Sequence, residues 1–582
     1  RWLAGELLQY HRREARPAWW WFFERCEQMT DAELFEDSES ISGLWSAGAP
    51  IVDKRSLIHS LAFPPQQHKL APGATPIDPA TSQGAGTIVA LDDNAGTLQL
   101  RRSANRKDEP LPCALVPPGP YRTDAQREAL FRLASSMLAN DCRYSALRDI
   151  LARTAPRIQG RASGSVIQAP DIAEQRALTL DLDSSYLFIQ GPPGTGKTWT
   201  GARLIIELMR QRRRVGVTAT SHKAIHNLLD EVECAAKEEG LRFRGLKKSS
   251  GDNAESRYES ASIASTDKTE AFANAAPDAL LFAGTGWLFA DKRLDAAVDT
   301  LVIDEAGQVS LADALAMGTC ARNIVLLGDP LQLAQVSQGT HPRGTGASVL
   351  EHLLGDDLTV APHMGVFLES TRRMHPDVCR FISEIVYDSR LRGIPELERQ
   401  TTAFGTGLRF KAVSHAGNGS SSPEEASAIA TEIAKMVGAP WTNREGVTRA
   451  LSTADFMVVA PYNAQVRRLR EALAGAGLAE VPVGTVDKFQ GREAAVVFYS
   501  MATSSIEDVP RNLEFLFSRN RLNVAVSRAM CLAVIVASPQ LLESDARTIE
   551  QMRLVNALCR FVEIAEEQER LNDLRDVRTK AT

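Results

Sequence analysis

The stretch Ile189-Gln190-Gly191-Pro192-Pro193-Gly194-Thr195-Gly196-Lys197-Thr198 decides the fold of this chain. It has the form G-x-x-x-x-G-K-[ST] of a phosphate-binding loop, between an apolar run at 186–189 and apolar residues at helical spacing over 198–210. Such a loop turns its N–H groups towards phosphate oxygens, and the helix N-terminus adds the positive end of its dipole. The whole loop from Gly191 to Thr198 is therefore expected to hold ATP, through Gly191, Pro192, Pro193, Gly194, Thr195, Gly196, Lys197 and Thr198. Lys197 should reach the β- and γ-phosphates, and the Thr198 hydroxyl should face Mg²⁺.

Further apolar runs in the same half each end in polar residues, as parallel strands do at the ligand edge of an α/β sheet. The run at 300–303 precedes Asp304 and Glu305, and the run at 323–327 precedes the segment that holds Gln332. We expect Asp304 to lie in the outer shell of Mg²⁺, Glu305 to orient the attacking water, and Gln332 to sense the γ-phosphate. The run at 215–217 leads into Thr220, Ser221 and Asn227, whose residue types suit a phosphate backbone.

A second α/β lobe without a phosphate-binding loop should supply two arginine fingers, Arg373 and Arg528, when the lobes close. Arg372, beside Arg373, is expected near the nucleotide, because a planar guanidinium can stack on a base; a solvent-facing side chain is the alternative. Gln175, on a predicted helix before the loop, could read the adenine edge through its amide.

The chain divides by composition into six segments. Residues 1–54 and 119–160 are helical and form a stalk, while residues 55–118, punctuated by Pro and Gly, predict a small β-barrel. The aromatic cluster at 19–23 is interpreted mainly as packing between helices, and base stacking is the weaker alternative. Residues 161–357 and 358–544 form the two lobes, and 545–582 a C-terminal helix and tail. Residues 242–276, polar and rich in Ser and Asp, predict an insertion or a flexible excursion.

The composition restricts the class of protein. The net charge of −6 means that any nucleic-acid binding must come from local basic patches. Eight scattered cysteines without a C-x-x-C pair argue against a zinc ribbon or a disulfide framework and favour a cytoplasmic location. No apolar run has the length of a membrane span. The chain starts without Met, and we interpret it as a piece of a longer protein.

The ordered motifs GPPGTGKT, TSHKAIHN, DEAGQ, GDPLQL, RRMHP, VDKFQGRE and RLNVAVSRA resemble those of a superfamily 1 helicase. They are most similar to the branch of the nonsense-mediated-decay RNA helicase and the Okazaki-fragment helicase–nuclease. The resemblance implies an α/β fold of two RecA-like parallel-sheet lobes with a stalked β-barrel, and 5′→3′ movement on a single strand that crosses both lobes. It places Thr220, Ser221, Thr285 and Thr485 near strand phosphates. The motifs add Pro461 to the strand path, and Gly491 and Glu493 to the ATP site.

The expected partner is single-stranded nucleic acid, with DNA favoured over RNA, and the expected state is a monomeric motor. The resemblance also implies a RecB-like nuclease domain before this piece. Arg372 departs from the branch, which usually has an aromatic residue there. Two alternatives stay open: an ATP-switched clamp that does not unwind, and an RNA helicase. A P-loop kinase would not explain the second lobe with its two patterned arginines.

Overall fold

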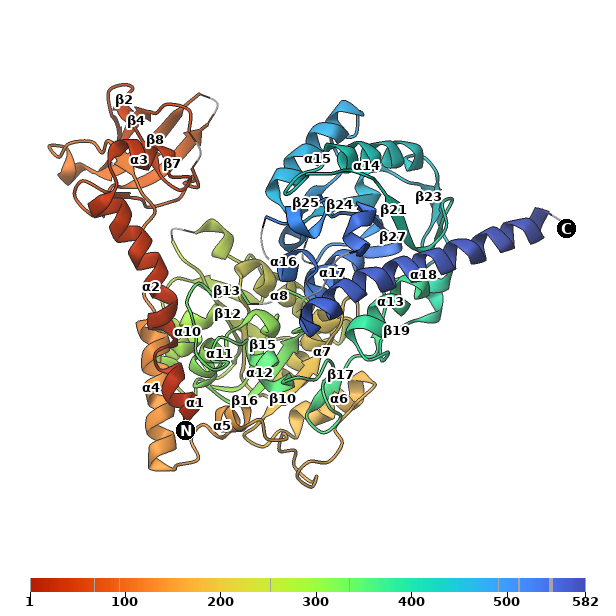
Figure 1. Cartoon of the computed structure of the whole chain (residues 1–582). Helices are drawn as coiled ribbons and strands as arrows, with labels where there is room; N and C mark the ends of the chain where they lie inside the picture. The colour runs from red at the N-terminus through yellow and green to blue at the C-terminus, as the bar shows by residue number, and fades with distance from the viewer. Residues whose placement is uncertain are drawn as a thin grey trace.

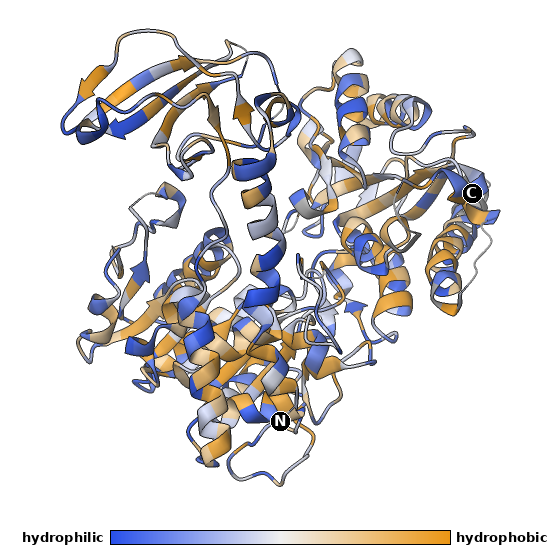
Figure 2. Cartoon of the chain, turned by 60° about the vertical axis from the view of Figure 1, so that its left-hand side comes forward, coloured by the Kyte–Doolittle hydropathy of each residue, from blue (hydrophilic) through white to orange (hydrophobic). Residues whose placement is uncertain are grey.

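The computed structural model describes residues 2–66, 68–93, 95–251, 253–333, 335–489, 491–510, 513–543 and 548–580. Two lobes, each built on a parallel sheet, lie side by side, and a small β-module stands on the helix α2 (Tyr10–Phe23) beside the first lobe (Figure 1). Hydrophobic residues gather in the strands of both lobes (Figure 2). Among the described residues, none of the helices is both long and apolar enough to span a membrane.

The first lobe is an eight-stranded sheet in the order β13-β12-β14-β11-β15-β16-β10-β17, with every pairing parallel. All five residues of β10 are buried, which is typical of a parallel strand covered by helices on both faces. The strands are β10 (Tyr186–Gln190), β11 (Val215–Thr218), β12 (Arg244–Lys248), β13 (Ile263–Thr266), β14 (Ala279–Ala283), β15 (Val298–Ile303), β16 (Ala321–Gly328) and β17 (Gly365–Phe367). Its helices include α6 (Ile172–Leu180), α7 (Lys197–Arg210), α8 (His222–Glu238), α10 (Gly286–Ala290), α11 (Leu311–Gly318) and α12 (Val349–Leu354).

The second lobe is a five-stranded parallel sheet in the order β21-β27-β26-β24-β25. The strands are β21 (Gly407–Ala412), β24 (Phe456–Ala460), β25 (Val483–Thr485), β26 (Ala494–Ser500) and β27 (Ala529–Ala537). Helices α13 (Pro376–Val386), α14 (Pro423–Met436), α15 (Asn463–Gly475) and α17 (Arg519–Val526) complete it, and the long α18 (Ile549–Lys580) packs along β21. The two RecA-like lobes of an α/β fold are confirmed.

The β-module differs from the predicted barrel. Its main sheet is antiparallel, built from β2 (Trp45–Ser46), β3 (Ile51–Asp53), β4 (Ser56–Ala62), β7 (Thr87–Asp92) and β8 (Thr97–Ser103). Within the described part of the module no pairing closes this sheet, which is flanked by two-stranded pairs, β1 (Ile41–Ser42) with β9 (Ala114–Leu115) and β5 (Ile77–Asp78) with β6 (Gln83–Gly84). Because β1 and β9 pair, the module spans about residues 41–116 and starts earlier than the predicted residue 55.

Three other sequence predictions were wrong. Residues 244–248 and 263–266 of the predicted excursion are β12 and β13, at one edge of the first sheet. The predicted lobe boundary at 357 falls too early, because β17 belongs to the first sheet. The aromatic cluster on α2 is largely outside the core: Trp20 is 67% exposed and Trp21 54%, since only part of the helix surface packs. Residues 544–547 and 581–582, at the edges of the predicted C-terminal segment, lie outside the described residues.

Candidate nucleotide site between the lobes

The phosphate-binding loop connects β10 to α7, as predicted. Gly194 and Gly196 have φ of 74° and 82°, a region that favours glycine. A Cβ on Gly194 would lie 2.6 Å from both Thr371 Oγ1 and Arg373 Cβ, so the loop packs closely on the segment after β17. Lys197 Nζ donates to the carbonyl of Gly191 at 2.7 Å, which holds the ammonium inside the loop where phosphates would bind.

Asp304 and Glu305 follow β15 and form a carboxylate pair at the same edge of the sheet. Burial of Asp304, with the charge of Glu305 beside it, raises the pKa of Asp304 to about 7, and Lys197 opposes the shift. A divalent cation would restore the charged form of Asp304. The described residues hold no cluster of three or more His, Cys, Asp or Glu side chains able to bind a metal. Mg²⁺ often takes one or two carboxylates together with nucleotide phosphates and water, so Asp304 is a residue that could hold it.

A hydrogen-bonded network joins the two lobes next to this pair. Tyr387 Oη donates to Asp329 Oδ2 at 2.6 Å, and Asn523 Nδ2 donates to Tyr387 Oη at 2.8 Å and to the carbonyl of Leu331 at 2.8 Å. Gln332 Nε2 also donates to Asp329 Oδ2, at 2.8 Å, so the predicted γ-phosphate sensor is held on a neighbouring carboxylate. The network connects the strand end after β16 directly to α13 and α17.

Arg528 is a buried cation without an ionic partner among the described residues. Arg528 comes after α17 and is 2% exposed. Among the described residues, its guanidinium makes one hydrogen bond, a long contact of 3.5 Å from Nη1 to the carbonyl of Arg492. Nε and Nη2 are buried and unpaired. Burial and the nearby charge of Arg373 lower the pKa of Arg528 to about 9. An unsatisfied guanidinium costs free energy, and an anion placed between the lobes would recover it.

Arg373 has partners within its own lobe, the second. Its Nε lies 2.7 Å from Glu493 Oε2, and its Nη1 donates to the carbonyl of Ser527 at 3.3 Å. The charge of Glu305 also reaches Arg528, where it raises the pKa. The structure thus brings Arg373, Arg528, Glu305 and Glu493 together. Gly491 is exposed, and nothing in the structure assigns it a contact with nucleotide.

A cavity of about 1140 Å³ opens beside the loop, and its wall includes Gln175, Thr195, Gly196, Trp199 and Arg372. Gln175 Nε2 donates to the carbonyl of Ala169 at 2.9 Å, while its Oε1 is buried and unpaired, which leaves an acceptor for a ligand amino group. Arg372 is one of the lining residues and is also exposed to solvent, so its contact with the base stays a prediction. Arg444, which also lines the cavity, donates from Nη1 to the Arg372 carbonyl at 3.0 Å. The cavity is large enough for a nucleoside next to the phosphate loop.

Replacing Arg372 with tyrosine should sharpen the preference for ATP over other nucleoside triphosphates and leave the maximal rate nearly unchanged. An aromatic ring in this wall would lie flat on the base, whereas the guanidinium can also turn towards phosphates. Turnover of ATP, GTP, CTP and UTP by both proteins gives the comparison. Identical selectivity would show that the side chain at this position does not contact the base.

The predicted strand-binding residues lie at the C-terminal ends of parallel strands in both lobes. Thr220 and Ser221 follow β11, and the Ser221 hydroxyl accepts from the Ala224 N–H at 3.1 Å and caps α8. The other four follow β14, β24 and β25 or lie one turn into α8: Asn227, Thr285, Pro461 and Thr485. Asn227 is exposed and Thr285 and Thr485 are half-buried, but Pro461 is buried and can offer only backbone. Their contacts with a strand stay predictions.

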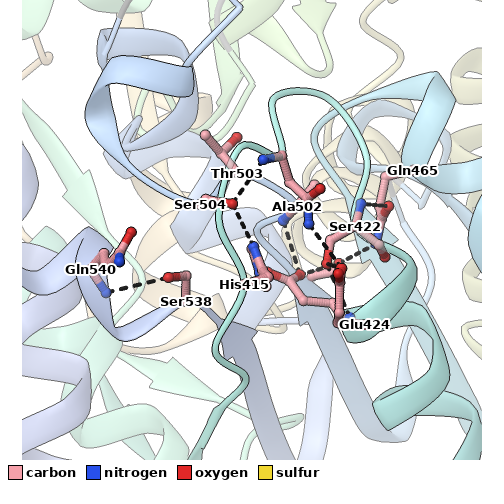
Figure 3. Close-up of polar contacts among 12 residues, drawn as sticks. His415, Ser422, Glu424, Gln465, Ala502, Thr503, Ser504, Ser538 and Gln540 are labelled. Atoms are coloured by element: carbon pink, nitrogen blue, oxygen red, sulfur yellow. Dashed lines mark hydrogen bonds and ion pairs between the residues drawn. The ribbon is translucent and has the colours of Figure 1, made fainter.

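A second polar cluster lies inside the second lobe (Figure 3). His415 Nδ1 contacts Ser504 Oγ at 2.7 Å and its Nε2 contacts Glu425 Oε1 at 2.9 Å. The residue types are those of a hydrolase triad, but the ring is reversed, because a triad presents Nε2 to the serine and Nδ1 to the carboxylate. The side chains of His415 and Glu425 are fully buried, so no substrate can reach them. Gln465 extends the network, because its Nε2 donates to Ser500 Oγ at 2.9 Å. The cluster ties α14 and α15 to the segment after β26 and is structural.

Sequence reasoning missed four residues of this site. Trp199 and Arg444 line the cavity, and Tyr387 and Asn523 carry the network between the lobes. Asn523 lies in a quoted motif, which was a usable signal. Trp199 directly follows Thr198 of the phosphate-binding loop, so the sequence already placed it beside the nucleotide. Tyr387 and Arg444 have no local pattern, because only the tertiary structure brings them to the nucleotide site.

Two family models, both of the AAA domain, match the chain in succession, over residues 173–349 and 346–540. Together they span the phosphate-binding loop, the carboxylate pair and both arginines. The chain belongs to the superfamily 1 helicases. Within them it lies in the branch that includes the ATP-dependent helicase NAM7 of Saccharomyces cerevisiae, DNA2 and SMUBP-2, so the predicted family is confirmed.

Three curated relatives show the range of similarity to this helicase. The probable helicase MAGATAMA 3 of Arabidopsis thaliana is 29% identical, over 46% of this chain and 33% of its own length. The DNA replication ATP-dependent helicase/nuclease DNA2 of Gallus gallus is 28% identical, over 61% of this chain and 35% of its own length. The DNA-binding protein SMUBP-2 of Rattus norvegicus is 24% identical, over 90% of this chain and 61% of its own length. The helicase thus spans less than two thirds of the length of these relatives.

Proposed function

We propose that this helicase uses ATP and Mg²⁺ to move 5′→3′ along a single strand, DNA in preference to RNA, and unwinds duplex ahead of it. The observation that carries the ATP-driven part is Arg528, a buried guanidinium with two unpaired nitrogens on the lobe that lacks the phosphate-binding loop. Such a group is a built anion site that needs a ligand held by the other lobe. A nucleotide triphosphate in the loop of the first lobe supplies that anion.

Each of the residues at the nucleotide site then has a chemical task in hydrolysis. The loop N–H groups and Lys197 hold the β- and γ-phosphates, and Thr198 and Asp304 would hold Mg²⁺, which neutralises phosphate charge when bound. Glu305 orients the attacking water. Arg528 and Arg373 stabilise the charge that develops on the phosphate, and they do so only when the lobes close. The network through Asp329, Tyr387 and Asn523 couples the movement of one lobe to the other during closure.

The choice of DNA is supported by the names of relatives, since DNA2 and a DNA polymerase alpha-associated DNA helicase are both described as acting with DNA. RNA remains the alternative, because the human relative Mov10l1 is named an RNA helicase. The movement in the 5′→3′ direction is supported by the motif resemblance. A cytoplasmic location, a monomeric motor and an attached nuclease domain stay proposals.

ATP turnover with and without single strands tests this function. We expect DNA oligonucleotides to stimulate turnover many-fold, and RNA of the same sequence to compete poorly with them. Equal or better stimulation by RNA would favour an RNA helicase. Strand binding that follows the nucleotide state, without stimulated turnover and without strand displacement, would favour the ATP-switched clamp.

Removal of the β-module should weaken the binding of single-stranded nucleic acid, and the coupling of ATP turnover to that binding, more than basal ATP turnover. The module has its own hydrophobic core, which includes Ile41, Leu61, Leu98 and Leu115, and its two ends meet where β1 pairs with β9. A short linker between residues 40 and 117 can therefore replace it without opening the motor lobes. Strand affinity and turnover are measured on both proteins. A variant that binds strands like the intact chain would exclude the module from the strand path.

A further inference from the structure

Lys247, in β12, is a buried ammonium without a carboxylate partner among the residues that the structure describes. The residue is 0% exposed, and its Nζ contacts the carbonyl of Lys248 at 2.7 Å, the carbonyl of Ser256 at 3.1 Å and Nδ1 of His222 at 3.2 Å. An ammonium has three N–H donors and no acceptor, so these three contacts use all of them. The Nδ1 of His222 must then be the acceptor.

This contact fixes the proton of His222. With Nδ1 accepting, the neutral imidazole carries its proton on Nε2. A second cation 3.2 Å from the ammonium would be repelled, and together with partial burial this lowers the pKa of His222 to about 4. No partner for the Nε2 of His222 is found in the part of the chain that the structure describes, and this atom is not among the buried unpaired ones. His222 therefore offers solvent a neutral N–H donor whose tautomer is set.

This donor lies at the edge of the first lobe where the predicted contacts with single-stranded nucleic acid gather. His222 is the first residue of α8, directly after Thr220 and Ser221, and its neighbour Lys223 is exposed. His226, one turn further, cannot play the same part, because its Nε2 is buried. Phosphate oxygens accept hydrogen bonds from neutral side chains as well as from cations, and such contacts fix the register of a strand.

We propose that His222 is a phosphate-binding residue of the strand path, and that Lys247 acts behind it as a positioning residue that keeps the Nε2–H pointing outwards as a donor. This inference rests on the proposed function, because it names one contact of the same single strand. It differs from an ordinary basic contact in that the group touching the phosphate carries no charge.

The arrangement has a pH dependence with a definite sign. Burial and the charge of Lys248 lower the pKa of Lys247 to about 8. Once deprotonated, the amine keeps two donors for the two carbonyls and accepts from Nδ1–H, so Nε2 loses its proton. Strand affinity should hold from pH 6 to 7.5 and fall as the pH rises through about 8. Two other titratable groups lie here. The pKa of His226 is lowered, and the pKa of Tyr258 is raised by burial and by Asp230 and Glu233, so neither group titrates in this window.

Three variants of the full chain test the contact by binding to a labelled single-stranded DNA oligonucleotide without nucleotide. His222→Leu should lose about ten- to hundredfold in affinity, and His222→Asn, which keeps an N–H donor, should recover most of it. The matched control is Lys223→Ala, which removes a cation at the next position. Thermal melting shows that each variant is folded.

The salt dependence separates a neutral donor from a charge. Loss of one cationic phosphate contact reduces the slope of log affinity against log salt by about 0.7 for a single strand. Lys223→Ala should show such a reduction, and His222→Leu should keep the wild-type slope. A reduced slope for His222→Leu, or an affinity equal to wild type, would overturn the proposal. Failure of the wild-type chain to bind any strand would instead refute the proposed function.

Lys247→Met tests the positioning role. Without the ammonium, the pKa of His222 should rise from its lowered value, although burial still holds it below the ordinary one. Affinity should therefore rise at acidic pH, and the fall through pH 8 should disappear. A pH profile unchanged from wild type would refute the role of Lys247. If this variant does not fold, the wild-type profile decides, because a flat profile from pH 7.5 to 9 contradicts the proposed switch of tautomer.

Discussion

Lys197→Ala is expected to reduce ATP turnover to background. The ammonium of Lys197 is held within the loop by the Gly191 carbonyl, where it would meet the β- and γ-phosphates. Its loss removes the cation that the loop itself contributes, and neither arginine can replace it before the lobes close. Turnover is measured with saturating ATP and single-stranded DNA. A rate within a few-fold of wild type would refute the assignment of this site.

Glu305→Gln provides the contrast to Lys197→Ala, because it removes the base and keeps the phosphate contacts. This variant should bind nucleotide and accumulate in the closed, strand-bound state without turnover. Loss of nucleotide binding in Glu305→Gln would mean that Glu305 holds the nucleotide rather than orienting water. Arg560→Ala, which removes a half-buried arginine paired with Glu384 on α13, should behave like wild type in the same assays.

Arg528→Ala should lower the rate of hydrolysis by about 10³–10⁵ and change nucleotide affinity much less. Arg528 belongs to the lobe without the loop, so its contact with phosphate forms mainly in the closed transition state. Removing the guanidinium should not destabilise the free protein, because the unpaired charge already costs free energy there. Lysine should not restore the rate, since it lacks the planar fork of donors.

Turnover and nucleotide binding of Arg528→Ala, measured separately, decide between two roles. Equal losses of binding and rate would identify Arg528 as a contact of the bound ground state. A clear drop in melting temperature of the nucleotide-free variant would show that the side chain has partners that stabilise the fold, against the unpaired nitrogens seen here.

The sequence predicted those parts of the molecule whose signal is local. The phosphate-binding loop is one continuous stretch, and Asp304 and Glu305 directly follow a buried strand, so both could be recognised without a structure. The strand β12, which lies between β13 and β14, could not, because its residues, Arg244–Lys248, include three cations and show no clear apolar pattern. β17 was missed because three residues are too short for a periodic signal.

The contacts between distant segments had no signal in the sequence. Asp329, Tyr387 and Asn523 come from three separate segments, and the pairing of Lys247 with His222 joins β12 to the start of α8. The interpretation of the α2 aromatics as packing failed for a related reason. A cluster of tryptophans shows that apolar surface is present, but only the tertiary structure shows whether another helix covers it.

Unwinding of duplex DNA with a single-stranded tail at one end tests the central claim most directly. With ATP and Mg²⁺, the chain should displace the paired strand when the tail is 5′, and neither Lys197→Ala nor Arg528→Ala should do so at a comparable rate. Displacement that requires a 3′ tail would contradict the proposed direction. No displacement from either substrate, with strand-stimulated ATP turnover intact, would contradict unwinding itself.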